Sequence, residues 1–212
     1  MSAKHLTARK VIRMDNKCYG NNKGFSLVEL IVIVLIMGVL VTGAAISFSV
    51  VYNADEERAA KKIVSMMGEA RTKAIAVNSD TADVTFEIRK DANGNFVAGI
   101  YKTVSGTKEE LVPAERISNY RVKIEVAKKN KTDRLELKRQ NEESTTEEVY
   151  AVYSFKKATG GLKSVSGKTN NTTFSTVISG GEANMYLDII VSKGSDEQHL
   201  IIVPATGRCY LE

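Results

Sequence analysis

The sequence predicts an α+β fold in which one long amino-terminal helix packs on the antiparallel β-sheet of a head. Two periodicities predict this fold. Residues 25–77 contain no proline and change from a continuous apolar run to apolar residues at helical spacing, whereas residues 79–212 alternate apolar and polar side chains in short runs. Because the chain shows no internal repeat, we expect one head rather than two domains.

Charge is concentrated before the apolar run. Residues 1–24 hold six cations and one anion, which accounts for the whole net charge of +5, and the rest of the 212-residue chain holds 24 of each sign. The basic balance therefore belongs to the amino end and gives no general argument for nucleic-acid binding. With 43% hydrophobic residues, the chain is suited to building a packed core.

Residues 25–51 form an apolar run of 27 residues in which Glu29 is the only ionisable side chain. A helix needs about 20 apolar residues to cross a bilayer, so this run is long enough to span one. Cations that precede a span favour a cytoplasmic amino end. We therefore expect a single-pass segment with the amino end inside and the rest of the chain exported.

The carboxylate of Glu29 requires an explanation, because a charge inside the membrane costs about 2.5–3.5 kcal/mol on insertion scales. In an ordinary signal anchor, Glu29 would lie at the headgroup level and contact water. The alternative is a partner of opposite charge that is supplied inside the membrane. The residues around Glu29 favour this second interpretation.

Residues 23–30 read KGFSLVEL. This segment resembles the processing motif of the type IV prepilin family, which includes pilins and type II secretion pseudopilins. The resemblance implies a pilin-like fold. It also implies that prepilin peptidase cleaves after Gly24, methylates the new amino terminus on Phe25, and leaves Glu29 as the acid at the fifth mature position. Many pilins carry a proline near the twenty-second mature position, where this chain has Ile46.

Cleavage after Gly24 is also reasonable on physical grounds. It creates a cationic amine on Phe25, and Glu29 of a neighbouring subunit can neutralise this amine in a medium of low dielectric constant, where opposite charges attract strongly. Such a pair would set the register between stacked helices, and a glycine lets a protease approach the backbone closely. The expected partners are prepilin peptidase, other pilin or pseudopilin subunits and, before assembly, membrane lipid.

The resemblance and the residue patterns together divide the chain into four regions. We expect a cleaved basic leader at residues 1–24, a transmembrane and filament-core half of the helix at residues 25–51, an amphipathic half at residues 52–78, and a β-rich extracytoplasmic head at residues 79–212. The protein would lie in the bacterial cytoplasmic membrane before assembly and in a cell-surface or extracytoplasmic filament afterwards. The apolar face of the amphipathic half consists of Ile63, Met67, Ala70, Ala74 and Val77.

The head is expected to contain about eight strands, of which the first two form a hairpin around a turn at residues 91–95. Asp91, Asn93 and Asn95 resemble the start of a calcium loop, but Phe96 stands where such a loop needs glycine, so we interpret them as turn residues. Polar loops are predicted at residues 140–148 and 159–171. Further strands are predicted at residues 120–127, 134–139, 149–155, 172–178, 185–191 and 200–203.

Residues suited to catalysis are sparse. The two histidines, His5 and His199, do not make a catalytic metal site, no Ser/His/Asp or Cys/His set is evident, and no phosphate-binding glycine loop occurs. Cys18 would leave with the leader, and we interpret Cys209 as a partly buried, unreactive thiol rather than half of an intermolecular bridge. We therefore predict a protein that is not an enzyme and has no cofactor or metal.

A late segment, residues 200–208, resembles the closing strand and glycine-bearing turn of GspH/FimT-like minor pseudopilins through its triplet Thr206-Gly207-Arg208. Some FimT-like pilins take up DNA through a basic glycine–arginine region near the carboxyl end, which makes Arg208 a candidate polyanion contact. The nine cations of residues 116–139 are candidates as well. Because four glutamates follow these cations, we favour the interpretation that the cations and the glutamates screen each other's charge.

The favoured function is structural: a minor pilin or pseudopilin that is clipped at Gly24 and joins a type IV pilus or a type II secretion-like filament through its apolar helix and Glu29. The alternative function is a DNA-uptake pseudopilin of a competence system, whose head binds DNA. Two competing hypotheses concern the amino end. In one, a secretory signal is cleaved near residues 42–45, and in the second, an extracellular receptor is anchored by an intact leader.

Overall fold

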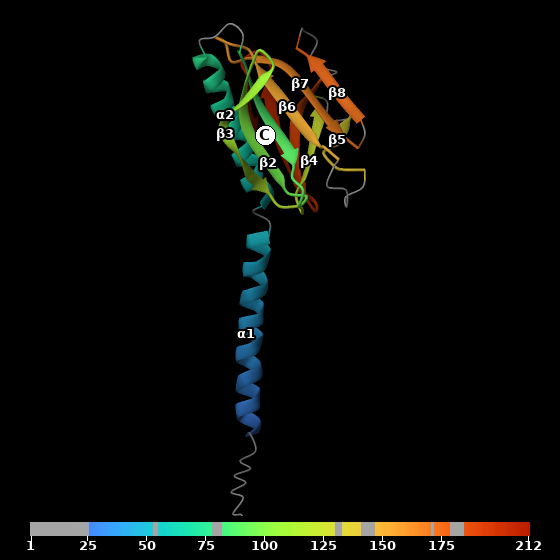
Figure 1. Cartoon of the computed structure of the whole chain (residues 1–212). Coiled ribbons are helices and arrows are strands. Elements are labelled where there is room, and N and C mark those ends of the chain that lie inside the picture. The colour runs from blue at the N-terminus through green and yellow to red at the C-terminus, as the bar shows by residue number, and fades with distance from the viewer. Residues whose placement is uncertain are drawn as a thin grey trace, which may run out of the picture. The chain divides into compact units, whose positions relative to one another are not determined.

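The computed structural model describes residues 26–52, 55–77, 82–129, 133–140, 147–170, 172–178 and 185–212 (Figure 1). Within helix α1 (Leu27–Tyr52), side chains are described as far as Thr42. The chain divides into two compact units between Ala45 and Ile46. The first unit contains the start of α1, and the second contains the head.

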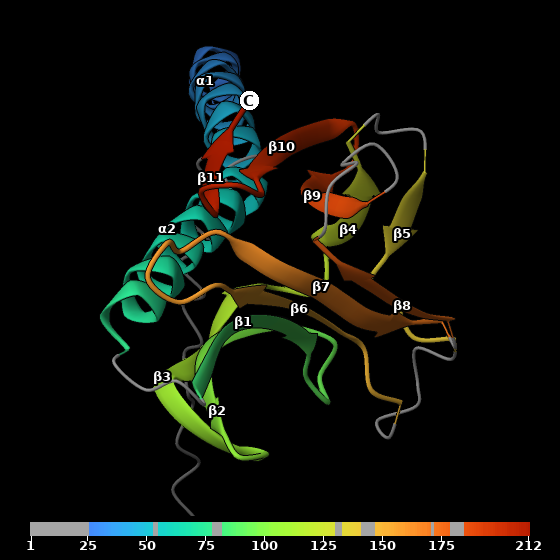
Figure 2. The same cartoon turned by 90° about the horizontal axis from the view of Figure 1, so that it is seen from above.

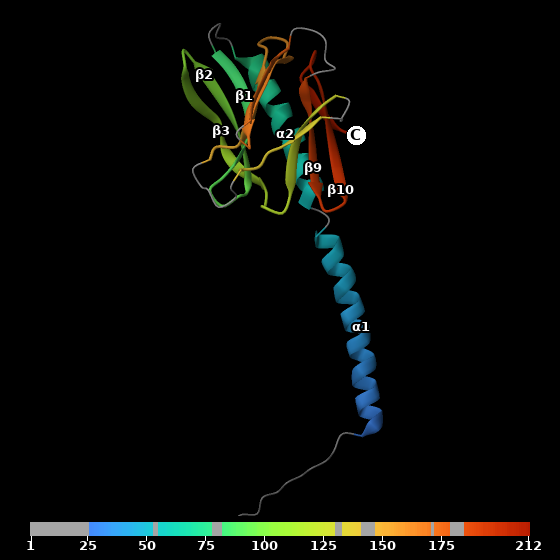
Figure 3. The same cartoon turned by 90° about the vertical axis from the view of Figure 1, so that its right-hand side faces the viewer.

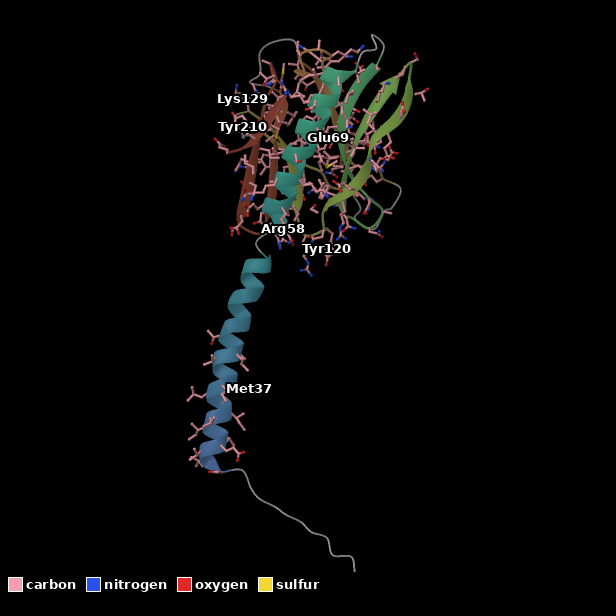
Figure 4. The ribbon with its side chains drawn as sticks, turned by 90° about the vertical axis from the view of Figure 1, so that its left-hand side faces the viewer. Met37, Arg58, Glu69, Tyr120, Lys129 and Tyr210 are labelled. Carbon is pink, nitrogen blue, oxygen red and sulfur yellow. The ribbon has the colours of Figure 1, made fainter. Side chains whose placement is uncertain are left out.

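Helix α1 presents an apolar surface on every side in its described part. All side chains from Ser26 to Thr42 are exposed, and Figure 4 shows them projecting around the helix near Met37. Thr42 is polar, but its hydroxyl donates a hydrogen bond of 2.7 Å to the Gly38 carbonyl one turn earlier. The helix therefore satisfies this polar group internally.

The structure contains two helices where the sequence predicts one continuous helix over residues 25–77. α1 ends at Tyr52 and α2 spans Asp55–Ala76, while residues 53 and 54 lie outside the described residues. α2 begins with three acidic residues, which are favourable at a helix N-terminus because the backbone dipole is positive there. The helical region is confirmed, and its continuity through residues 53 and 54 stays a prediction.

One face of α2 is buried in the head, as the helical spacing predicts. Ile63, Met67, Ala70 and Ala74 are buried, and Val77 packs partly against the core. This face touches strands of two sheets, so it is wider than the predicted row of apolar residues. The additional buried residues are Glu56, Ala59, Ala60 and Met66.

The described head contains two antiparallel sheets. Sheet A has the strand order β3-β2-β1-β6-β7-β8, and sheet B has the order β11-β10-β9-β4-β5. α2 contacts strands of both sheets, and Figures 2 and 3 show it between the β1–β3 side of sheet A and the β10–β11 side of sheet B. The strands of sheet A are β1 (Ala82–Lys90), β2 (Phe96–Val104), β3 (Thr107–Ser118), β6 (Tyr150–Phe155), β7 (Leu162–Thr169) and β8 (Thr172–Val177). The strands of sheet B are β4 (Lys123–Lys128), β5 (Arg134–Glu136), β9 (Tyr186–Lys193), β10 (Asp196–Val203) and β11 (Arg208–Leu211).

Buried side chains from α2 and both sheets form one hydrophobic cluster. Val84, Phe86 and Ile88 of β1 point into it at every second position, which is the spacing that a strand with one buried face requires. The predicted α+β fold, a helix packed on an antiparallel sheet head, is therefore confirmed.

Each of the predicted strands has a counterpart in the structure. The hairpin is β1–β2, and the Asp91 backbone N–H closes its turn with a hydrogen bond of 2.8 Å to the Asn95 carbonyl. β3, β7 and β11 have no counterpart among the predicted strands. The other predicted strands correspond, with shifted ends, to β4, β5, β6, β8, β9 and β10.

The predicted polar loop at residues 159–171 is wrong, because β7 occupies most of it. Leu162 and Val165 are fully buried, and Gly167 lies against the ring of Phe174, so packing outweighs the low strand propensity of the glycine and lysines in this segment. The other predicted loop, at residues 140–148, falls largely on residues 141–146, which lie outside the described residues.

Three glycines allow a turn of sheet A and a turn of sheet B to touch through their backbones. Gly160 and Gly161 lie between β6 and β7, and Gly207 lies between β10 and β11. A Cβ on Gly207 would collide with the carbonyl oxygen of Gly160, and a Cβ on Gly161 would lie 2.6 Å from the carbonyl oxygen of Ala205. Gly207 also has a positive φ of 66°, which other residues rarely adopt. We call these three residues the glycine contact.

Two hydrogen bonds reinforce the glycine contact. The Leu162 backbone N–H donates to the Pro204 carbonyl at 2.8 Å, and the guanidinium of Arg71 on α2 donates to the Thr206 carbonyl at 2.6 Å. The contact therefore joins both sheets and α2 at one place.

The beginning of α2 is fixed by residues from distant parts of the sequence. Asp55 Oδ2 lies 3.0 Å from Lys193 Nζ at the end of β9, and it accepts a hydrogen bond of 3.3 Å from the Asn119 amide. The Lys193 hydrogen bond is the largest cause that holds the pKa of Asp55 below its usual value. Figure 4 shows Arg58 of α2 and Tyr120 of the β3–β4 turn at this same end of the head.

The Asp55–Lys193 pair predicts a pH dependence of stability. Because the folded state lowers the pKa of Asp55, the pair stabilises the head above the unfolded-state pKa, near 3.8, and this contribution is lost as the pH falls through the lower folded-state pKa. We expect Asp55→Asn to reduce the free energy of unfolding by about 1 kcal/mol at pH 7. Urea unfolding should show this difference shrinking below about pH 4.

The matched control for this prediction is Asp83→Asn, which breaks an Asp–Lys pair with Lys163 at 2.7 Å. Both side chains of that pair are more than two-fifths exposed, so water and salt screen it. We expect Asp83→Asn to change stability less than Asp55→Asn does. Equal effects of the two substitutions at every pH would contradict the role given to Lys193.

Candidate processing and assembly site

The residues predicted for processing and assembly lie at the start of the apolar run. Glu29 is in the first turn of α1, where the positive end of the helix dipole favours a carboxylate. The first backbone hydrogen bond of this turn runs from the Leu30 N–H to the Ser26 carbonyl at 3.1 Å. Gly24 and Phe25 lie outside the described residues.

The surroundings of Glu29 are apolar and open. Leu27, Val28 and Leu30 are 75%, 66% and 57% exposed, so the helix turn around the carboxylate is not covered by the described part of the chain. Among the described residues, none pairs with Glu29. A charge on such a helix requires either water or a cation from another molecule once the apolar surface is covered.

Residues 19–45 match the prokaryotic N-terminal methylation motif. This motif is typical of type IV pilins and pseudopilins and implies processing by prepilin peptidase. The matched residues include Gly24, Phe25 and Glu29, the three positions predicted for cleavage, methylation and assembly. Pilin-like proteins are generally structural rather than enzymatic. No match to the chain was found among curated proteins or among solved structures.

The methylation motif covers the end of the predicted leader and most of α1, and it does not extend into the head. Residues 200–208 lie outside it, so no comparison supports the narrower resemblance to GspH/FimT-like pseudopilins. The methylation motif thus supports the general class of the protein, pilin or pseudopilin. It does not distinguish one kind of filament from another.

The methylation motif also implies a membrane-anchored precursor that becomes part of an extracytoplasmic filament. The apolar run of the sequence extends over residues 25–51, whereas the side chains of α1 are described from Leu27 to Thr42. Within the described residues, no helix has both the length and the hydropathy that a membrane span requires.

Arg208, the candidate polyanion contact, is the first residue of β11 and is exposed. It pairs in register with Val203, and its backbone N–H donates to the Thr206 hydroxyl at 3.3 Å. The neighbouring Gly207 is required by the glycine contact. The triplet Thr206-Gly207-Arg208 therefore has a structural explanation that involves no ligand.

Several cations of residues 116–139 are engaged with acids or backbone oxygens of the head. Arg134 lies 3.0 Å from Glu197, and Lys128 lies 2.6 Å from Asp133, whose pKa is lowered chiefly by that hydrogen bond. Arg139 is buried and donates to backbone carbonyls, one of them that of Asp91 at 2.5 Å. These contacts favour screening of charge over a polyanion surface, but the acids in the two ion pairs are Glu197 and Asp133 and not the four glutamates that follow the cations in the sequence.

The turn at residues 91–95 is held by its own hydrogen bonds. The Asp91 carboxylate accepts from the backbone N–H of Asn93 at 2.9 Å and of Asn95 at 2.8 Å. The interpretation of these residues as a turn is confirmed. In the portions of the chain that the structure describes, no group of three or more His, Cys, Asp or Glu residues is arranged to hold a metal ion.

Cys209 is a half-buried free thiol on β11. Burial, together with the negative charge of Asp188, raises the pKa of Cys209 to about 12. The thiolate is the reactive form of cysteine, so this thiol is poorly reactive near neutral pH. The predicted partial burial is confirmed.

Proposed function

We propose that the chain is a minor pilin or pseudopilin, a structural subunit of a type IV pilus or a type II secretion-like filament. Prepilin peptidase cleaves after Gly24 and methylates the new amino terminus on Phe25. The apolar α1 then packs among the equivalent helices of other subunits. The observation that carries the proposal is the position of Glu29, an acid that pairs with none of the described residues and lies on an exposed apolar helix inside the methylation motif.

The chemistry of assembly follows from that acid. A second subunit that packs against α1 covers the apolar side chains and removes water from the Glu29 carboxylate, which raises the cost of leaving the charge unpaired. The amine of Phe25 from the neighbouring subunit neutralises it. Attraction between the two charges is strong where the dielectric constant is low, so it selects one register of helix against helix.

The DNA-uptake alternative is less well supported. Its contact surface would consist of Arg208 and the cations of residues 116–139. Arg134 and Lys128 already pair with acids, and Gly207 is explained by packing. The methylation motif, in contrast, coincides with all three residues that the assembly proposal uses.

Mass analysis of the amino terminus tests the proposal most directly. For protein isolated from membranes, we expect the chain to begin at Phe25 and to carry one added methyl group. Replacing Gly24 with valine should leave the basic leader attached, because a branched side chain obstructs the protease at the bond that it cuts.

Gly20→Val is the matched control, since it places the same side chain four residues earlier in the leader. We expect normal cleavage in that variant. A native chain that keeps its leader, or one that begins within residues 42–45, would contradict the proposal and would favour the anchored receptor or the secretory signal respectively.

A further inference from the structure

The free edge of β8 differs from the other sheet edges of the described head. β8 is the last strand of sheet A, beyond β7 (Figure 2), and its sequence TTFSTV has no charge, proline or glycine. Thr173 and Ser175 are exposed and Val177 is 67% exposed, with the alternation that places all three on one face. An uncharged edge of β-branched and hydroxyl side chains is a template for pairing with another strand.

The other three edges carry features that hinder such pairing. β3 contains Pro113 and several charged residues, and its register with β2 shifts at three places. β5 has three residues, and β11 has four. Charge, proline, irregular register and short length all protect a sheet edge from strand addition. Among the described edge strands, β8 is thus the one that is longer than four residues and also carries no charge or proline.

β8 is also held in place before any partner arrives. It pairs with β7 along its whole length, from Thr169 opposite Thr172 to Ser164 opposite Val177. The ring of Phe174 is buried over Gly167, with its centroid 5.7 Å from that of Tyr186 on sheet B. A strand that is already ordered loses little conformational entropy when another strand binds.

We infer that the free edge of β8 pairs with β8 of a second copy of this chain. Self-pairing sets only uncharged side chains opposite one another, so no like charges repel. Two six-residue strands bury far less than the roughly 800 Å² per partner of a stable complex, so the pair requires copies that are already held close together. A second copy anchored in the same membrane meets this condition through effective concentration.

Cross-linking of the full-length chain in membranes tests this pairing. A single cysteine is introduced as Ser175→Cys, and the membranes are treated with a short bismaleimide. We expect a covalent homodimer. Ser166→Cys is the matched control, because Ser166 lies directly across from Ser175 on β7, one strand further from the edge. The chain without an added cysteine measures the background from Cys209 and, where the leader is kept, from Cys18.

A second substitution in the Ser175→Cys chain separates edge pairing from chance proximity. Val177→Lys places a charge on the exposed edge and should abolish the dimer, whereas Val177→Thr should retain it. Persistence of the dimer in the lysine variant would overturn the pairing. So would a dimer yield from Ser175→Cys that is no greater than that from Ser166→Cys, or a cross-linked product that contains a different protein.

The inference relies on the proposed function only for the membrane that brings the copies together. The amino terminus of the same sample is therefore identified by mass. A membrane-bound chain without the dimer overturns the β8 pairing whether or not its leader has been removed. A dimer formed by a chain that keeps its leader supports the pairing and contradicts the proposed processing.

Discussion

Replacing Glu29 with glutamine is expected to leave the chain cleaved after Gly24 but largely absent from filaments. The amide has nearly the size of the carboxylate but no charge, so the amine on Phe25 of the neighbouring subunit would be buried without a counter-charge. An unpaired charge in an apolar medium costs about 2.5–3.5 kcal/mol. Since 1.4 kcal/mol corresponds to a factor of ten, incorporation should fall roughly 100-fold.

The measurement compares membrane and filament fractions of the same cells and identifies the amino terminus in each by mass. Thr42→Val is the matched control, because it removes another polar group of α1, whose hydroxyl donates to the Gly38 carbonyl of its own helix. That variant should be cleaved and incorporated normally. Normal incorporation of Glu29→Gln would show that the carboxylate does not set the register of assembly.

Gly207→Ala is expected to destabilise the head by about 2–5 kcal/mol. A left-handed conformation costs a residue with a Cβ about 1–2 kcal/mol, and overpacking typically costs a further 1–3 kcal/mol. The atom that a Cβ would meet is the Gly160 carbonyl oxygen, which belongs to the backbone and does not move aside as a flexible side chain does. Urea unfolding of the full-length chain in detergent measures the loss.

Gly194→Ala separates the cost of the left-handed conformation from the cost of overpacking. Gly194 has a φ of 67°, close to that of Gly207, but a Cβ there would meet no atom within 4 Å. We expect this variant to lose only the cost of the left-handed conformation, about 1–2 kcal/mol. If both alanines cost the same, then the glycine contact has no role in holding the two sheets together.

The sequence is sufficient to predict the helical region, the β1–β2 hairpin and the α+β class, because each depends on local periodicity. Ile63, Met67, Ala70 and Ala74 lie at helical spacing and are buried as expected. The turn at residues 91–95 was also predictable, since Asp91 forms its hydrogen bonds within four residues along the chain.

Features that depend on distant residues were not predictable in this way. β3 is rich in charge, and β7 is rich in serine, glycine and lysine, so neither has the composition of a strand until neighbouring strands pair with it. Lys193 shows no sign in the sequence of meeting Asp55, which lies 138 positions earlier.

Some residues of the candidate site can be identified from the sequence, and others cannot. Glu29 was recognisable because a charge interrupts an apolar run, and the methylation motif includes it. Gly24 and Phe25 rest on the motif alone, since they lie outside the described residues. Gly207 belongs to a turn that the sequence predicts, but its neighbour Gly160 is identified only from the packed backbone.

The order of the strands has a consequence for how the head forms during synthesis. The chain leaves sheet A after β3, builds β4 and β5, returns for β6 to β8, and ends in sheet B with β9 to β11. Ile124 of β4 must therefore wait for Val191 of β9, its partner across the ladder. Until β9 is made, that edge of β4 lacks its partner strand, and an unpaired strand edge in a newly made chain is prone to aggregation.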